Sequence, residues 1–343
     1  MFGFGTLVFC VEIGIMPYRL RAGESVRLGV RRVIREQIDS AIEELTDGKD
    51  RDEAIHDARK CVKRSRGALR LVRFDLGKQF HQENAVFRDI GRRLSELRDA
   101  QALLEVLDDI AKRYKHPLPS IRKGLEERKR RFEEATDVPS VVEQTIVCLK
   151  QAREWMSHWP LHSNGFAAVA PGLGGTYRAG RDALAAAYSD PTPENFHEWR
   201  KRAKDHWYHI RLLENLWTPV MHTYESSLKS LEQCLGDDHN LEVLHTAIQA
   251  SPELFSNERE LTTLKHLADT FREELRTEAR KIGERIYGPT RKEFIGQMQH
   301  LWEAWKHEAE RSWARRTVGI KKAAARVSEP QPLTSIAASE LAN

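Results

Sequence analysis

The sequence predicts an all-α protein made of two similar helical halves. From residue 24 onward, apolar residues recur with the 3.6-residue period of an α-helix, and no stretch shows the convincing alternation of a strand. The 20 glycines and 13 prolines are few for 343 residues, and they gather between the periodic segments. A single ungapped register of 141 residues, which places His197 on His56, also aligns a second helical segment in each half.

Length and composition bound the class of protein. The chain of 343 residues is long enough for one large domain or two or three ordinary ones. Lys and Arg total 55 against 51 Asp and Glu, and the mean hydropathy is −0.58, which excludes a membrane-spanning protein. Four cysteines without CxxC spacing indicate a reducing compartment rather than disulfides or zinc. We therefore expect a cytoplasmic protein with no membrane partner.

Four segments organise the chain. Residues 1–16 form an apolar extension that lacks a basic start and a cleavage site and is too short to span a bilayer. We expect a first helical bundle at 17–160, a second at 161–325, and a disordered tail at 326–343 that is rich in Pro, Ser and Ala. Acidic residues at 50–53 and 190–194 mark two helix starts. Within the bundles, helices are expected at 24–46, 52–76, 80–114, 120–136, 139–158, 166–188, 193–216, 220–250, 256–286 and 290–322.

The helix expected at 52–76 carries the most informative pattern. On a helical wheel, His56 shares one stripe with five cations, and small and apolar residues occupy the opposite face. Cations four residues apart repel each other, so a polyanionic ligand is the expected compensation. The stripe consists of His56, Arg59, Lys60, Lys63, Arg66 and Arg70. The predicted core face consists of Ala58, Cys61, Ser65, Ala68, Val72 and Leu76.

The second half repeats this stripe in a weaker form. Its members are His197, Arg200, Lys201, Lys204 and Arg211. Asp205 and Trp207 stand where the first copy has Arg64 and Arg66, and we expect them to make this wall less positive. The shared register predicts pseudo-two-fold packing. We expect the two stripes to line one basic channel, with the acidic residues on the outside of the molecule.

Phosphate is the anion that these cations suit best. Nucleic-acid binding normally adds stacking aromatic rings beside the cations, and no aromatic residue interrupts the first stripe before Phe74, although Trp207 and Tyr208 accompany the second. This pattern favours a phosphate chain without bases. RNA or DNA binding stays an alternative.

A third possibility is a metal-dependent polyphosphate hydrolase. In that case Asp99, Asp237 or Asp238 would hold a divalent ion. The competing interpretation is that the acids beside His239 flank a helix and form hydrogen bonds across the bundle, and the sequence favours it. The chain contains no HExxH and no GxxxxGK[ST] motif. The glycines at 172–175 follow no strand and indicate a loop or the start of a helix.

The two repeated motifs resemble those of a CHAD domain, the conserved histidine α-helical domain. IHDARKCVKRSRGALRLVR at 55–73 and LSELRDAQALLEVL at 94–107 resemble its first half. FHEWRKRAKDHWYHIRLLE at 196–214 and LGDDHNLEVL at 235–244 resemble its second half. The resemblance extends from about Pro17 to Ile320. It implies two four-helix-type bundles in one unit and the binding of inorganic polyphosphate in a basic central cavity.

The resemblance also implies which residues bind and which activity is absent. Many members follow a CYTH domain with a Glu-x-Glu-x-Lys signature, which this chain lacks, so triphosphatase activity is not implied. We expect a non-enzymatic protein without metal or cofactor, associated with polyphosphate granules, for which nucleic acid is a weaker competitor. The expected binding residues are Arg31, Arg35, His56, Arg59, Lys60, Lys63, Arg66, Arg70, Arg98, Arg178, Arg181, His197, Arg200, Lys201, Lys204 and Arg211.

Overall fold

The computed structural model describes residues 18–47 and 50–327, with side chains as far as residue 315. These residues form eleven α-helices and short 3₁₀ segments, without a strand. The all-α prediction is therefore confirmed. The expected extension at 1–16 lies outside the described residues, as does the tail from 328 onward.

The helices follow the predicted order closely. In the first half they are α1 (Val26–Thr46), α2 (Arg51–Leu71), α3 (Arg73–Leu76), α4 (Gln79–Tyr114), α5 (Pro119–Ala135) and α6 (Val138–Trp155). In the second half they are α7 (Ala170–Ser189), α8 (Pro193–Leu212), α9 (Thr218–Ala250), α10 (Glu258–Ile286) and α11 (Arg291–Val327).

Several boundaries differ by a few residues from the prediction, and two of the differences affect the description of the fold. The single helix expected at 52–76 is broken at Val72 into α2 and α3. Helix α11 continues to Val327, so the first residues of the expected tail are helical.

The helix starts agree with the sequence because side-chain oxygens cap them. Those of Ser25, Asp50, Asp137, Thr192 and Asn257 each accept a hydrogen bond from a backbone N–H in the first turn.

The two halves use the same packing order. Helix α2 packs between α1 and α4, and α8 packs between α7 and α9. Shifting α2 by the 141-residue register gives 192–212, and α8 spans Pro193–Leu212. The correspondence supports the predicted repeat. The repeat and the division of the chain near residue 160 stay predictions.

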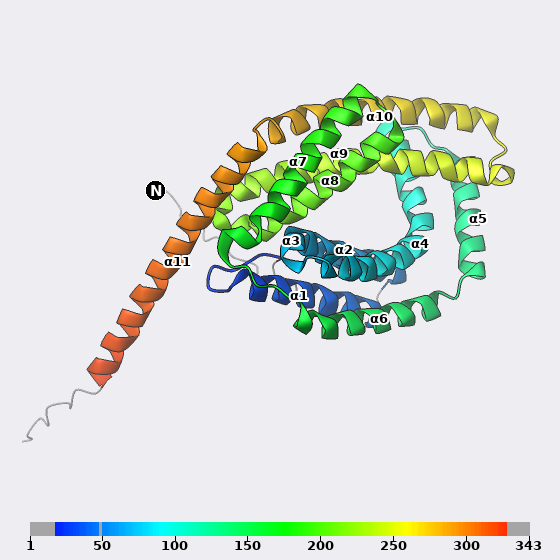
Figure 1. Ribbon diagram of the computed structural model, residues 1–343. Coiled ribbons are helices and arrows are strands. Elements are labelled where there is room, and N and C mark those ends of the chain that lie inside the picture. Colours follow the sequence, from blue (N-terminus) through cyan, green and yellow to red (C-terminus); the bar gives the residue numbers. More distant parts are fainter. Residues whose placement is uncertain (1–17, 48–49, 328–343) are drawn as a thin grey trace, which may run out of the picture.

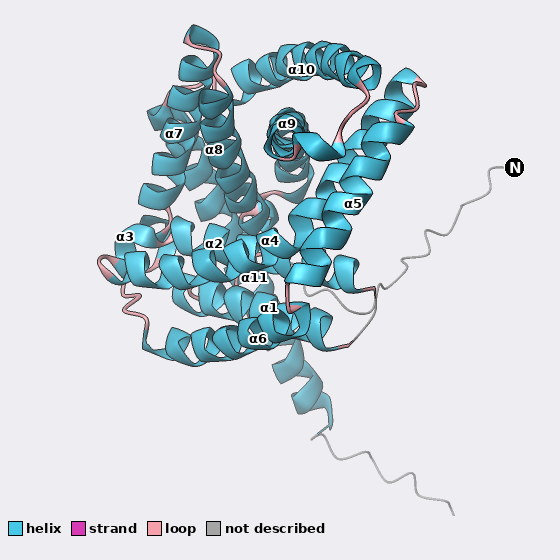
Figure 2. Cartoon of the chain, turned by 90° about the vertical axis from the view of Figure 1, so that its right-hand side faces the viewer, coloured by secondary structure: helices cyan, strands magenta, loops and turns pink. Residues whose placement is uncertain are grey.

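The views in Figures 1 and 2 show how the helices are arranged. Helices α4, α5, α9 and α10 gather at one end of the body, while α11 extends away from the opposite end. Among the described residues, no helix is long and apolar enough to cross a membrane.

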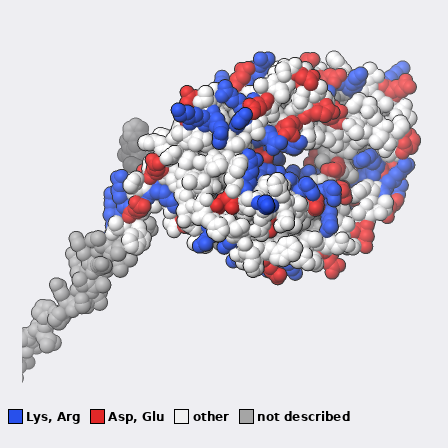
Figure 3. All heavy atoms as spheres, in the orientation of Figure 1, with Lys and Arg blue, Asp and Glu red and all other residues white. Residues whose placement is uncertain are grey.

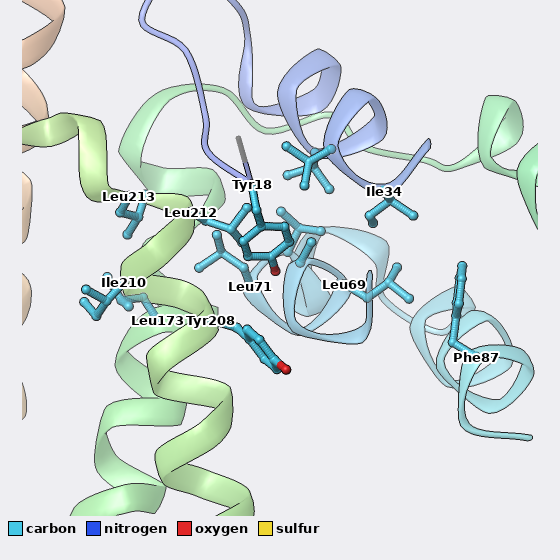
Figure 4. Packing of buried hydrophobic residues seen from close by; sticks show 14 of the residues in the cluster. Tyr18, Ile34, Leu69, Leu71, Phe87, Leu173, Tyr208, Ile210, Leu212 and Leu213 are labelled. Carbon is cyan, nitrogen blue, oxygen red and sulfur yellow. The ribbon is translucent and has the colours of Figure 1, made fainter. Parts of the chain in front are cut away.

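The main hydrophobic core is shared by both halves. Ile34, Leu69 and Phe87 come from the first half, and Leu173 and Tyr208 come from the second, and all five lie in one cluster. Figure 4 shows α2 and α8 packed together around these side chains. A second cluster joins α4, α5, α9 and α10 at the other end of the body. The core face predicted for the helix at 52–76 is confirmed, since Ala58, Cys61, Ser65, Ala68, Val72 and Leu76 are all buried.

The predicted glycine segment lies in the first turns of α7, as the start of a helix. A Cβ atom at Gly172 would come within 2.0 Å of the Leu71 carbonyl oxygen. Glycine is needed here because no side chain fits between the start of α7 and the end of α2. This contact ties the second half to the helix that carries the first stripe.

Candidate functional site

Helix α2 holds the first stripe on its polar face. The carboxylate of Asp50 accepts a hydrogen bond from the Glu53 backbone N–H (3.0 Å) and so caps the helix. Asp52 and Glu53 add negative charge to the first turn, where the helix dipole favours it. The cations of the stripe follow in the next four turns, opposite the buried face.

A close crossing of α2 and α8 brings the two stripes together. At Gly67, an added Cβ would lie 2.7 Å from the Cβ atom of Tyr208, so this approach requires glycine. The Nε2 atom of His209 lies 3.1 Å from the Gly67 carbonyl oxygen. Burial lowers the pKa of His209 to about 3. The ring is therefore neutral and donates its Nε2–H to that carbonyl.

Four cations from the two stripes converge beside α9. They are Arg59 and Lys63 of α2 and Arg200 and Lys204 of α8, and we name them the central cation cluster. The Lys204 Nζ lies 2.5 Å from Oε1 of Glu232 in α9, and the Arg200 Nη2 lies 3.8 Å from the same oxygen. The Nε of Arg59 donates to the Ser95 hydroxyl of α4 (2.8 Å).

The central cation cluster holds four cations against two carboxylates, Asp99 and Glu232. Burial lowers the pKa of Lys63 well below its ordinary value, and the charges of Lys204, Arg59 and Arg200 lower it further. Burial acts to raise the pKa of Glu232, but the charges of Lys204 and Arg200 outweigh it and keep that pKa low. Glu232 is therefore ionised. An anion placed here would relieve the repulsion among the four cations.

The histidines at the starts of the two stripes lie beside cations. Burial, then Lys60 and Arg98, lower the pKa of His56. Burial, then Lys201 and Arg200, lower the pKa of His197. Both rings are therefore mainly neutral at pH 7.

A third histidine joins this region from α9. The ring of His239 lies on that of His197, with their centroids 4.1 Å apart. Burial, then the charge of Arg200, lower the pKa of His239 to about 3. His197 and His239 thus lie near the same cations, Arg200 and Lys201.

A second group of arginines surrounds Asp205 at the other end of the crossing. Asp205 is buried and forms an ion pair with Arg70 across the two halves (2.9 Å). Arg66, Arg73 and Arg202 also lie within its electrostatic reach. Burial, then the charge of Arg70, lower the pKa of Arg66 to about 10. Four arginines therefore lie around one buried carboxylate.

The surface view shows these charges together. In Figure 3 the molecule is hollowed between α2, α4 and α9, and Lys and Arg side chains gather around the hollow. Acidic side chains lie mostly towards the periphery of the same face, with some beside the hollow.

Three more expected site residues are Lys60 and Lys201, which belong to the stripes, and Arg98 of α4. Lys60 and Lys201 are exposed and pair with acids of their own helices, Asp57 (2.7 Å) and Glu198 (2.5 Å). Arg98 is buried, and one of its terminal nitrogens lies 2.6 Å from Glu105. Its Nε and Nη1 are buried without a hydrogen-bond partner. Arg98 also lowers the pKa of both His56 and Arg59, which places it next to them.

Arg211 lies apart from the central cation cluster. Its guanidinium lies over the rings of Trp207 (5.2 Å) and Tyr18 (5.8 Å). The nearest carboxylate in an ion pair with it is that of Glu225, at 3.7 Å. Trp207 stacks on Tyr208 and donates its indole N–H to Glu225. The ring therefore already has a stacking partner and a hydrogen-bond acceptor within the protein.

Four expected residues are not brought to the crossing. Arg31 donates to the Trp159 carbonyl (2.5 Å), and the charges nearest to it are Arg27 and Arg35 of its own helix. Arg178 is 70% exposed beside Asp182, and Arg181 donates to the Pro289 carbonyl. Helices α1 and α7 present their apolar residues to the core, which turns these arginines to other faces. The four expected residues are Arg31, Arg35, Arg178 and Arg181.

The expectation that the acidic residues lie on the outside is wrong for several of them. Glu232 lies within the central cation cluster, and Asp205 and Asp238 are buried. Converging cations need nearby carboxylates, because an unpaired buried charge costs several kcal/mol. Sequence reasoning therefore missed Glu232. It also missed His239, although the 141-residue register places His239 on Arg98 and could have found it.

Two of the acids considered for a metal ion lie beside cations, Asp99 near Arg59 and Lys63 and Asp238 in ion pairs. Asp238 lies 2.8 Å from Arg276 and 3.6 Å from Arg272, both in α10. The interpretation that these acids form hydrogen bonds across the bundle is therefore confirmed for Asp238. Burial, Asp109 and Glu232 raise the pKa of Asp237 to about 6. Within the described part of the chain, no group of three or more His, Cys, Asp or Glu could hold a metal ion.

The fold and the site together define an all-α protein in which two cationic helices cross. At the crossing, cations outnumber carboxylates. A family model described as the CHAD domain matches residues 32–249. The chain therefore belongs to the CHAD domain family. The matched region contains both stripes and ends in α9, so α10 and α11 lie beyond it.

Solved structures agree with this fold. The crystal structure of the CHAD domain from the plant Ricinus communis has a TM-score of 0.54 at 18% identity, covering 84% of this chain and 97% of that one. PptA from Streptomyces chartreusis has a TM-score of 0.54 at 14% identity, covering 78% of this chain and all of that one. These likenesses concern the fold. No curated protein matches the chain.

Proposed function

We propose that the protein binds inorganic polyphosphate at the central cation cluster and along the two stripes, without a catalytic step. The observation that carries the proposal is the convergence of Arg59, Lys63, Arg200 and Lys204, whose positive charges outnumber the two nearby carboxylates, Asp99 and Glu232. Burial and then the neighbouring cations lower the pKa of Lys63, and an added anion would oppose the effect of those cations. Family membership supports the same ligand, as the sequence resemblance implies.

The length of the stripe favours a linear polyanion over a single phosphate. From His56 to Arg70 the stripe runs for about 21 Å, at about 1.5 Å per residue. Arg66 and Arg70 continue the cationic surface beyond the central cluster towards Asp205. Bound counterions would be released along this length, so the affinity should fall as salt is raised, by analogy with nucleic acids.

Calorimetric titration with a long polyphosphate chain tests the proposal. We expect salt-sensitive binding that the double substitution Arg59→Ala/Lys63→Ala weakens at least about tenfold, with a slope against log salt smaller by about 2. The matched control is Arg178→Ala/Lys292→Ala, which removes the same two charge types from exposed positions away from the crossing. Absence of binding at low salt, or equal losses in the two double variants, would overturn the proposal.

Nucleic acid is the competitor that the second stripe suggests. Trp207 and Tyr208 lie beside Arg211, but Trp207 is already stacked and hydrogen-bonded. In a competition experiment, polyphosphate should displace a labelled RNA, and RNA should fail to displace polyphosphate. The reverse order would favour a nucleic-acid-binding protein.

Release of phosphate on adding magnesium would instead support the metal-dependent polyphosphate hydrolase. For the cell, we propose a cytoplasmic location at polyphosphate granules.

A further inference from the structure

The far half of α11 is a feature that the proposed function does not use. Phe294, Met298, Trp302 and Trp305 bury the near half of the helix in the core. Lys306 ends this contact by donating to the carbonyl oxygens of Ala22 (2.6 Å) and Glu24 (3.2 Å). Beyond it, every described side chain from 307 to 315 is exposed except that of Ala309, which is half-buried. Figure 1 shows this segment standing away from the body.

The sequence of this segment changes sharply in charge. Residues 311–327 contain six Lys and Arg and no Asp or Glu. The segment is helical to Val327, and from Lys306 onward it extends for about 31 Å at about 1.5 Å per residue. The near half of α11 carries acids and bases together. The far half is therefore a distinct basic element outside the region of the family match.

The basic and apolar positions of residues 311–327 fall on different faces of the helix. At 100° per residue, positions 313, 317, 320, 324 and 327 lie within an arc of about 80°. They are Trp, Thr, Ile, Ala and Val. Arg311, Arg315, Lys322 and Arg326 group on the opposite side, and Arg316 and Lys321 flank the apolar arc. This is the pattern of a basic amphipathic helix.

We propose that residues 307–327 bind the surface of an anionic lipid bilayer, with the helix face that positions 313, 320 and 327 share towards the lipid. Such a surface accepts an apolar stripe and its flanking cations at once. Trp is favoured at that interface, and Trp313 is 69% exposed. The expectation of no membrane partner concerns segments that span a bilayer, and binding to the surface of a bilayer needs no such segment.

A second copy of the chain fits this helix less well. Spacings of four and three residues along the arc would allow a coiled coil. The flanking positions would then place Arg316 and Lys321 against each other in a parallel pair, or each against itself in an antiparallel pair. Like charges repel in either arrangement. A bare polyanion would need the cations and would have no use for the separate apolar arc.

Vesicle flotation with the full chain tests the inference. We expect binding to vesicles of phosphatidylcholine mixed with phosphatidylglycerol, and at least about tenfold weaker binding to phosphatidylcholine alone. The substitutions Trp313→Ser/Ile320→Ser keep the charge and should weaken binding about tenfold. Arg315→Gln/Lys322→Gln should weaken it similarly and reduce its dependence on salt.

The control separates this helix from the central cation cluster. Arg59→Gln/Lys63→Gln removes two cations from the proposed polyphosphate site and should leave vesicle binding within about twofold, since the lipid surface contacts another element. Three outcomes would overturn the inference. They are the absence of binding to anionic vesicles at low salt, unchanged binding of Trp313→Ser/Ile320→Ser, and loss of binding in the Arg59→Gln/Lys63→Gln control. Dimerisation that Trp313→Ser/Ile320→Ser abolishes would also overturn it in favour of a second copy.

Discussion

Glu232 of α9 lies 2.5 Å from the ammonium of Lys204, inside the cluster of cations that the two repeated stripes form. The same carboxylate lies 3.8 Å from Arg200 and within electrostatic reach of Lys63. It thus stabilises the cations in the free protein and occupies the place where an anionic ligand would act. Stability and ligand binding therefore place opposite demands on this one residue.

The substitution Glu232→Gln should separate the two demands. Without the carboxylate, the four cations repel each other more, and the free energy of unfolding should fall by about 1–3 kcal/mol. The affinity for polyphosphate at low salt should rise, because the ligand no longer competes with a resident carboxylate. Urea unfolding and calorimetry measure the two effects. A variant that binds polyphosphate more weakly while staying folded would contradict this account.

The affinity for polyphosphate should increase as the pH falls through the range in which His56 and His197 titrate. Both pKa values lie below 6.5 in the free protein because of burial and neighbouring cations. A bound polyanion favours the protonated rings and raises these pKa values, so binding takes up protons below about pH 6.5. Calorimetry in buffers of different ionisation enthalpy counts the protons. In His56→Gln/His197→Gln the uptake should largely vanish, and an unchanged uptake would assign it elsewhere.

Acid should destabilise the fold through its buried histidines. Burial lowers the pKa of His206 to about 3, against about 6.5 in an unfolded chain. The unfolded state therefore binds more protons between these values, and the free energy of unfolding falls as the pH drops from about 6.5 towards 3. The ring of His206 packs against Tyr177 and Phe294.

Replacing this ring tests the effect directly. His206→Phe should reduce the slope of unfolding free energy against pH, because phenylalanine fills the same aromatic site without titrating. His116→Gln, at an exposed position, serves as the control and should leave the slope unchanged. Equal slopes in the wild type and His206→Phe would show that other groups cause the acid sensitivity.

The close approach of α2 and α8 should depend on Gly67. A Cβ atom there would lie 2.7 Å from that of Tyr208, so Gly67→Ala should destabilise the protein by about 1–3 kcal/mol and weaken polyphosphate binding by spreading the stripes. Gly91→Ala in α4 is the matched control, since its Cβ would lie 3.4 Å from the Val62 side chain. That variant should be neutral or slightly more stable. Equal stability of the two variants in urea would contradict the tight crossing.

Much of the fold could be predicted because local rules set it. The capping residues Asp50 and Thr192 lie within a few residues of the predicted helix starts, and the small apolar face of α2 is buried as expected. The break at Val72 escaped prediction because the apolar period continues across it. It places the start of α7 against the end of α2, where only glycine fits. Such a contact between distant segments leaves no local pattern.

The candidate site was predictable only in part. Arg59, Lys63, Arg200 and Lys204 follow from helical spacing and the shared register, and the structure brings these four together. Arg178 satisfied the same chemical argument but lies on another face of the molecule. Charge and spacing along a helix show which residues share a stripe. They do not show which stripe another helix meets.

By itself the sequence determined that the chain is helical, where its helices lie, and that two cationic stripes repeat at a fixed interval, because these properties depend on neighbours along the chain. Tertiary structure decided that the stripes meet at Gly67, that Glu232 and His239 join them from α9, and that Arg31 and Arg181 do not. Those outcomes depend on how the apolar faces of distant helices pack together. Burial then changes the charge balance of the groups that the packing encloses.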